Sequence, residues 1–198
     1  MLVLHTDRLT LRPLTEHDAA FILQLLNEPS FIRFIGDRGM RTPHDARAYI
    51  RKGPVASYER FGFGLLLVTL KEDGTPIGIC GLLKRDTLED VDVGFAFLPA
   101  HWSKGYGFES ASAVIADGRT TLGLTRIVAI TNPDNVASIR LLEKLGLTFE
   151  RMIRIADEGK ELRLYSWVAS REQRAANVRQ WPQEMIPPCD SLPSSSPQ

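Results

Sequence analysis

The chain has 198 residues, a length typical of one domain, and its 43% hydrophobic and 24% charged residues are an ordinary globular mixture. Its 24 basic and 24 acidic side chains cancel, so the composition favours neither nucleic acid nor an anionic membrane as a partner. The longest apolar run, residues 62–70, is far shorter than the ~20 residues that cross a bilayer.

The N-terminal part of the chain predicts a strand followed by two helices. Apolar residues alternate over Leu9–Leu14, as in a half-buried strand. Helical spacing of apolar residues follows over residues 15–27 and again over residues 42–60, with a loop over residues 30–41 between them. Because glycine and proline interrupt helices, we expect the second helix to break at Gly53-Pro54.

Three antiparallel strands are predicted next. Asp73-Gly74 lies between the apolar runs Gly62–Leu70 and Ile77–Lys84, which is a strong hairpin signal. Val91–Leu98 alternates in the same manner and is expected to pair with the second of these runs. Pro99 ends it, because proline cannot donate to a strand ladder.

A glycine-containing loop then opens directly into a helix. The loop reaches Gly105-Tyr106-Gly107, and a helix follows to about Leu122 with Glu109 in its first turn. Free main-chain N–H groups at such a helix start form an anion site, and glycine lets a ligand approach the backbone. We interpret the loop as a phosphate cradle. Lys104 precedes the glycines and Phe108 follows them, which excludes a mononucleotide P-loop, whereas an ordinary loop with two glycines remains an alternative.

A second loop is expected at the same edge of the sheet. A buried strand over Arg126–Thr131 ends at Asn132-Pro133-Asp134-Asn135, where the residue types favour a turn. A helix over Val136–Lys144 follows and ends before Gly146. A hairpin over residues 148–169 completes the pattern.

The predicted fold is therefore α/β, a mixed and mostly antiparallel sheet of about seven strands with about four helices and one parallel crossover. We expect residues 1–170 to form this domain and residues 171–198, which are rich in Pro and Ser, to form a flexible tail. Cys80 and Cys189 have no metal-ligand spacing, and the N-terminus has no secretory pattern. We therefore expect free thiols, no metal and a cytoplasmic location.

Three motifs together resemble the GNAT superfamily of acyl-CoA-dependent N-acyltransferases, and within it the RimJ/RimL branch. The pyrophosphate loop Q/R-x-x-G-x-G/A resembles Trp102–Gly107, with tryptophan and Ser103 as departures from the family's residues. The family's N-x-x-S-x-x-x-x-E-K-x-G-F/L motif resembles Asn135–Leu147, and T-x-R-L-x-L-R of the branch resembles Thr6–Arg12. The resemblance covers about residues 4–169 and implies the GNAT fold, with acetyl-CoA as co-substrate.

The resemblance also implies which residues hold coenzyme A. The amides of the loop would bind the diphosphate, and strand amides near Phe97 and Leu98 would hold the pantetheine and the thioester carbonyl, beside a β-bulge that splays this strand from the next. The implied cofactor-binding residues are Phe97, Leu98, Trp102, Ser103, Lys104, Gly105, Tyr106, Gly107, Phe108, Asn132, Asn135, Ser138 and Lys144.

Three side chains are candidates for the chemistry. Many family members have a tyrosine acid where this chain has Leu142, so the resemblance points instead to Ser138 as a hydrogen-bond donor to the leaving thiolate. Asp92 and Glu109 are the candidate bases. Each also has a structural interpretation: a helix-cap hydroxyl for Ser138, an exposed strand carboxylate for Asp92 and a helix-dipole partner for Glu109.

The expected acceptor is a primary amine, above all a protein or peptide N-terminal α-amine, and the chain is expected to be a monomer or homodimer. A small-molecule amine and a non-catalytic acyl-CoA sensor are the alternatives. Acidic residues at Asp37, Asp157, Glu158 and Glu161 are candidates for attracting a cationic amine, although a solvated charge run explains them equally.

Overall fold

In a computed structural model the described part of the chain, residues 3–155 and 161–170, forms one eight-stranded sheet in the order β1-β2-β3-β4-β5-β6-β8-β7. The strands are β1 (Leu4–His5), β2 (Leu9–Pro13), β3 (Leu65–Leu70), β4 (Pro76–Lys84), β5 (Val91–Phe97), β6 (Arg126–Thr131), β7 (Thr148–Arg154) and β8 (Glu161–Val168). Residues 1–2, 156–160 and the predicted tail at 171–198 lie outside the described ranges.

Helices connect these strands. They are α1 (Ala19–Leu26), α2 (Pro29–Phe34), α3 (Pro43–Ile50), α4 (Ala56–Phe61), α5 (Tyr106–Thr120) and α6 (Val136–Lys144), with short 3-10 turns η1 (Glu16–Asp18) and η3 (Pro99–His101) and a π-helical turn η2 (Arg51–Val55).

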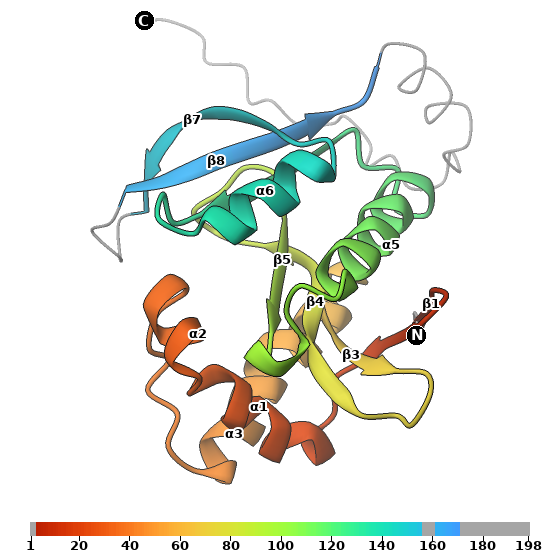
Figure 1. Ribbon diagram of the computed structural model, residues 1–198, viewed down its shortest axis with the longest axis vertical. Helices are drawn as coiled ribbons and strands as arrows, with labels where there is room; N and C mark the ends of the chain where they lie inside the picture. Colours follow the sequence, from red (N-terminus) through yellow and green to blue (C-terminus); the bar gives the residue numbers. More distant parts are fainter. Residues whose placement is uncertain (1–2, 156–160, 171–198) are drawn as a thin grey trace, which may run out of the picture.

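The helices form two layers, one on each face of the sheet (Figure 1). Apolar side chains of α5 and α6, such as Val114 and Leu142, pack with one set of strand residues. Those of α1 and α3, such as Ile22 and Ile50, pack with Leu67 and Ile79 on the opposite face. Because successive strand residues point to opposite faces, each layer buries one alternate set of apolar residues.

The sheet opens between β5 and β6. These strands are parallel and share a single paired position, Asp92 with Val128, whereas β5 pairs with β4 without interruption from Gly78–Phe97 to Lys84–Val91. The β5–β4 register contains no shift, so the expected β-bulge in β5 is absent from the described ladder. The gap arises because the two strands have no further paired position beyond Asp92 and Val128; β5 lies in the middle of Figure 1.

Two features differ from the sequence-based expectation. The short strand β1, paired with β2 through Leu4 and Leu11, brings the sheet to eight strands in place of seven. The predicted loop over residues 30–41 contains α2, in which Pro29 occupies a first-turn position and Phe31 is buried. A helix this short gives only a weak periodic signal, and it is stabilised here by burial of Phe31.

The predicted break at Gly53-Pro54 takes the form of the π-helical turn η2. Pro54 lies inside this turn and is buried, so the helix widens for five residues and continues as α4. Gly62 ends α4 in the left-handed conformation, with φ of +76°. The turn places Lys52 and Gly53 on the surface beside β4.

Candidate functional site

Free main-chain donors cluster at the start of α5. Within the described part of the chain, the N–H groups of residues 103–108 have no intramolecular acceptor, and the first helical bond is from Glu109 N to Gly105 O at 3.0 Å. Unpaired donors at the positive end of a 15-residue helix are suited to an anion. The structure thus brings together the residues that the sequence analysis assigned to the cradle.

The backbone of the cradle depends on conformations that glycine favours. Gly105 has φ of +84°, and Ser103 has φ of +59°, an uncommon value for a residue with a side chain. A Cβ at Gly107 would lie 3.1 Å from the Leu141 side chain on α6, so the absence of a side chain lets the two helices approach. The indole of Trp102 donates to Phe97 O at 2.8 Å and ties the loop to the end of β5.

A second contact fixes the loop to the N-terminal strands. Arg8 donates to Lys104 O at 3.0 Å, stacks over the Tyr106 ring at 4.7 Å and forms an ion pair with Glu109 at 2.6 Å. Glu109 also accepts from the Thr6 hydroxyl at 2.6 Å and from Arg8 N at 2.8 Å. We call this arrangement of Thr6, Arg8 and Glu109 the clamp.

The clamp determines the protonation of Glu109. Burial raises its pKa, but the hydrogen bonds from Thr6 and Arg8 outweigh burial, and the net pKa is lowered. Both carboxylate oxygens already accept hydrogen bonds. A general base needs a free lone pair and a pKa near the working pH, so these contacts favour a structural role for Glu109 over the expected catalytic one.

The turn before α6 has the expected polar residues. Asn135 caps the helix by accepting from Ser138 N at 3.1 Å, and Asn132 accepts from Asp134 N at 3.0 Å. The Ser138 hydroxyl is half-buried and has no hydrogen-bond partner within the described residues. Lys144, at the other end of α6, lies over the ring of Phe108, the last residue of the cradle, at 4.4 Å.

The strand amides at the gap are only partly those that we expected. Leu98 N donates to Ile77 O at 3.0 Å, so this amide faces β4 and is already used. Because alternate residues of an antiparallel pair direct their amides to the same neighbour, the amides of Phe95 and Phe97 face the gap. The main-chain N–H of Leu98 is therefore not free for a ligand, whereas that of Phe97 is; the assignment of both residues to coenzyme A stays a prediction. Phe95 was missed, although the period-two rule applied to β5 would have identified it.

Asp92 lies where β5 and β6 separate. Its residue is only 1% exposed, one carboxylate oxygen accepts from Arg85 Nε at 2.6 Å, and the other has no partner within the described residues. Burial raises the pKa of Asp92 to about 6, against the opposing effects of Arg85 and of the main-chain N–H of Ile130. The interpretation of Asp92 as an exposed strand carboxylate was therefore wrong, because the residue is buried beside Arg85 at the one position where β5 and β6 pair.

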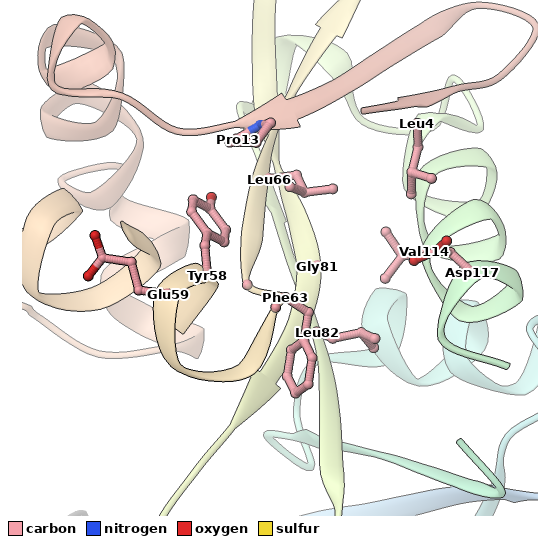
Figure 2. A pocket seen from close by; sticks show the side chains of 12 residues that line it. Leu4, Pro13, Tyr58, Glu59, Phe63, Leu66, Gly81, Leu82, Val114 and Asp117 are labelled. Carbon is pink, nitrogen blue, oxygen red and sulfur yellow. The ribbon is translucent and has the colours of Figure 1, made fainter. Parts of the chain in front are cut away.

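An apolar pocket of about 360 Å³ lies elsewhere, between α4, α5 and the strands β1 to β4 (Figure 2). Leu4, Leu66 and Val114 contribute to its walls, and none of the predicted site residues lines it. The pocket is therefore separate from the cradle and the gap. Within residues 3–155 and 161–170 there is no helix with the length and apolarity of a membrane span and no cluster of metal-ligating side chains.

Comparisons with known proteins identify the family of this chain. The family described as acetyltransferase (GNAT) domain matches residues 8–148. YoaA, an uncharacterized N-acetyltransferase of Bacillus subtilis strain 168, is 32% identical over 154 residues, 77% of this chain and 86% of that protein. An acetyltransferase from Agrobacterium tumefaciens strain C58 has a TM-score of 0.73 at 26% identity, covering 84% of this chain and 94% of that one.

RimL, a ribosomal L7/L12 alpha-N-protein acetyltransferase solved in complex with coenzyme A, has a TM-score of 0.73 at 14% identity, covering 85% of this chain and 98% of that one. At this identity the likeness shows the fold alone. The family match extends from Arg8 of the clamp, just before β2, through the cradle and the gap, to the first residue of β7. The chain therefore belongs to the GNAT family of acetyltransferases.

Proposed function

We propose that this protein moves an acetyl group from acetyl-CoA to the α-amine at the N-terminus of a protein or peptide. The observation that carries the proposal is that unpaired amides at residues 103–108 follow β5, the strand that borders the gap and carries the buried carboxylate Asp92. A donor held by these amides would present its acyl end to the gap.

The unpaired amides and the positive charge of the cradle support coenzyme A as its ligand. The amides of residues 103–108 would hold the diphosphate, Lys104 would add positive charge, and the Phe95 and Phe97 amides would hold the pantetheine and carbonyl. Acetyl-CoA supplies an activated acetyl thioester to this site. The residues of the chain orient the acceptor, remove its proton and solvate the leaving group.

Asp92 is the group that we assign as proton acceptor, directly or through water. Its pKa of about 6 keeps it ionised at neutral pH while leaving it a stronger base than an exposed aspartate. Moving a proton to it from an α-ammonium of pKa ~8 costs about 3 kcal/mol, against about 6 kcal/mol from a lysine of pKa ~10.4. This difference favours an α-amine acceptor.

Ser138 is assigned to the leaving thiolate. Its hydroxyl lies in the first turn of α6, without a partner in the described residues, and can donate a hydrogen bond there. Proton transfer from a serine is weak, so the role is stabilisation of the departing sulfur. Leu142, at the position of the family's tyrosine acid, is 1% exposed and belongs to the core.

A screen of acceptors, monitored by release of free thiol from acetyl-CoA, tests the proposal. N-terminal peptides, amino acids and polyamines are compared with N-acetylated peptides of the same sequence as blanks. We expect thiol release with free peptide N-termini above the hydrolysis background. Thiol release with polyamines alone would show that the acceptor is a small-molecule amine and not an α-amine. Binding of acetyl-CoA without thiol release would support a non-catalytic sensor.

Two variants assign roles within the same assay. Asp92→Asn is expected to lower kcat by ~10²-fold or more, and Ser138→Ala to lower kcat ~10-fold with an unchanged Kd for acetyl-CoA. Glu109→Gln serves as the comparison, because a structural carboxylate affects stability more than kcat at saturating substrate. Unchanged kcat in Ser138→Ala would remove this residue from the mechanism.

A further inference from the structure

A second pocket, of about 510 Å³, lies on the opposite sheet face from α5, beside the end of β4. Its lining includes four basic side chains, Arg38, Lys52, Arg60 and Lys84, and one acidic side chain, Asp86. In a chain whose basic and acidic residues number 24 each, this excess of positive charge is local. We call this site the basic pocket.

The charges of the basic pocket are not neutralised by carboxylates. Within the described residues Arg38 and Lys52 have no ion pair, and Arg60 lies over the Phe61 ring at 4.8 Å. Lys84 donates to the carbonyl oxygens of Leu88 and Glu89, each at 2.6 Å, which orients its charge without cancelling it. The pocket therefore retains a positive field that a bound anion would meet.

The acidic residues that were expected to attract a cationic amine are, where described, neutralised by ion pairs. Asp37 is paired with Arg41 at 2.5 Å and Glu161 with Arg154 at 2.9 Å, while Asp157 and Glu158 lie outside the described residues. The paired carboxylates have lost most of their attraction for a cation. The lining of the basic pocket, by contrast, has four basic side chains against the single carboxylate of Asp86, so its net charge is positive.

The basic pocket adjoins the gap where Asp92 lies. Leu83, which lines the pocket, is the cross-strand partner of Asp92, and its side chain reaches over Gly94, where a Cβ would lie 2.6 Å from it. Tyr49 also lines the pocket: burial raises its pKa, and the charges of Arg38 and Arg85 oppose the effect. Arg85 in turn holds Asp92.

The wall of the pocket is built by an unusual piece of backbone. Lys52, Gly53 and Pro54 belong to the π-helical turn η2, which widens the helix at the rim. Such turns are rare and occur often at functional sites. Without this turn, α3 and α4 would continue as one regular helix and Lys52 would occupy a different place on its surface.

We propose that the basic pocket binds acidic side chains of the acceptor, so that this acetyltransferase prefers peptides with Asp or Glu within the first few residues after the reactive amine. The inference rests on the proposed function, because the amine of such a peptide would lie at Asp92. An extended peptide advances about 3.3 Å per residue, and the adjacency of Leu83 and Asp92 requires only a short span.

The first test measures binding without turnover. Fluorescein-labelled peptides with three acidic, three neutral or three basic residues after an N-terminal alanine are titrated with the protein saturated with coenzyme A. We expect the acidic peptide to bind at least ~10-fold more tightly than the neutral one at low salt, and this advantage to shrink at high salt. Equal Kd values for acidic and neutral peptides would overturn the inference.

Charge-reversal variants locate the site. Lys52→Glu and Arg60→Glu are each expected to raise the Kd of the acidic peptide by ~5-fold or more and to leave the Kd of the neutral peptide within about 2-fold of the wild type. Arg47→Glu is the matched control, since Arg47 lies exposed on α3 but outside the basic pocket and carries the same change of charge. Equal weakening by Arg47→Glu would show a general charge effect and overturn the assignment.

A kinetic comparison separates this inference from the proposed function. Acetylation of acidic, neutral and basic peptides with equal kcat/KM would overturn the preference and leave the activity intact. If the acidic peptide binds in the pocket but no peptide is acetylated, the inference about the pocket stands and the proposed activity is overturned. Free glutamate acetylated as efficiently as the peptide would overturn a peptide as the occupant.

Discussion

Asp92 shows how the fold changes the chemistry of one residue. On an exposed strand it would be an ordinary carboxylate, but at the point where β5 and β6 diverge it is 1% exposed with one unpartnered oxygen. Burial raises its pKa to about 6 although Arg85 lies 2.6 Å away, so desolvation outweighs the ion pair. Burial thus disfavours the ionised form of Asp92, and the raised pKa makes its carboxylate a stronger base.

We expect the raised pKa of Asp92 to make the stability of the protein depend on pH. Between the unfolded pKa of 3.8 and the folded value of about 6, the native state binds more protons at Asp92 than the unfolded state. The contribution of Asp92 to the free energy of unfolding therefore falls as pH rises through this window, by up to ~3 kcal/mol, and the difference in stability between the wild type and Asp92→Asn changes by this amount.

Urea unfolding of both proteins from pH 4 to 7 measures the difference. Glu109→Gln is a suitable comparison because its group behaves oppositely. The folded pKa of Glu109 is lowered, so its stabilisation is present above the unfolded pKa and is lost as pH falls through the folded one. Parallel curves for the wild type and Asp92→Asn would show that Asp92 has an unshifted pKa.

At the scale of elements, the start of α5 depends on the short segment between β1 and β2, about a hundred residues earlier. The clamp joins Arg8 and Glu109, which are 101 positions apart, and Arg8 also holds Lys104 O. Glu109 is 17% exposed and Arg8 50%, so the ion pair is only partly screened by water. The contact orients the loop whose amides form the cradle.

A double-mutant cycle on Arg8→Ala and Glu109→Gln is expected to give a coupling energy of ~1 kcal/mol, reduced from a buried value by the exposure of Arg8. We expect each single variant to raise the Kd for acetyl-CoA several-fold, because the loop loses an anchor. The exposed pair Arg154–Glu161 serves as the control cycle, with an expected coupling below ~0.5 kcal/mol. Equal coupling in the two cycles would contradict a special role for the clamp.

At the scale of the whole molecule, the sheet consists of two halves that meet at a single paired position. Strands β1 to β5 form one half and β6, β8 and β7 the other, and α5 and α6 pack across the junction. The Phe95 and Phe97 amides lie along the open part of this junction. Acetyl-CoA bound there would accept hydrogen bonds from strand amides that have no neighbouring strand to pair with.

Acetyl-CoA is therefore expected to slow hydrogen exchange at residues 95, 97 and 103–108 together and to raise Tm, with ~2.7 kcal/mol of stabilisation at a concentration of 100 Kd. Gly105→Asp should abolish both effects, because a carboxylate would meet the diphosphate. Gly74→Asp is the matched control, since Gly74 has a similar φ of +74° in a distant turn with open space around it. A ligand-induced Tm rise that persists in Gly105→Asp would exclude the cradle as the binding site.

Local signals in the sequence determined much of this structure. The Asp73-Gly74 hairpin, the strand–loop–helix around Gly105 and the cap at Asn135 each depend on residues within a few positions of one another, so a short window contains their cause. Contacts between distant segments had no such window. The engagement of Glu109 by Arg8, the burial of Asp92 beside Arg85, the orientation of the Leu98 amide and the gathering of cations around η2 were decided by packing, because each depends on which strands become neighbours.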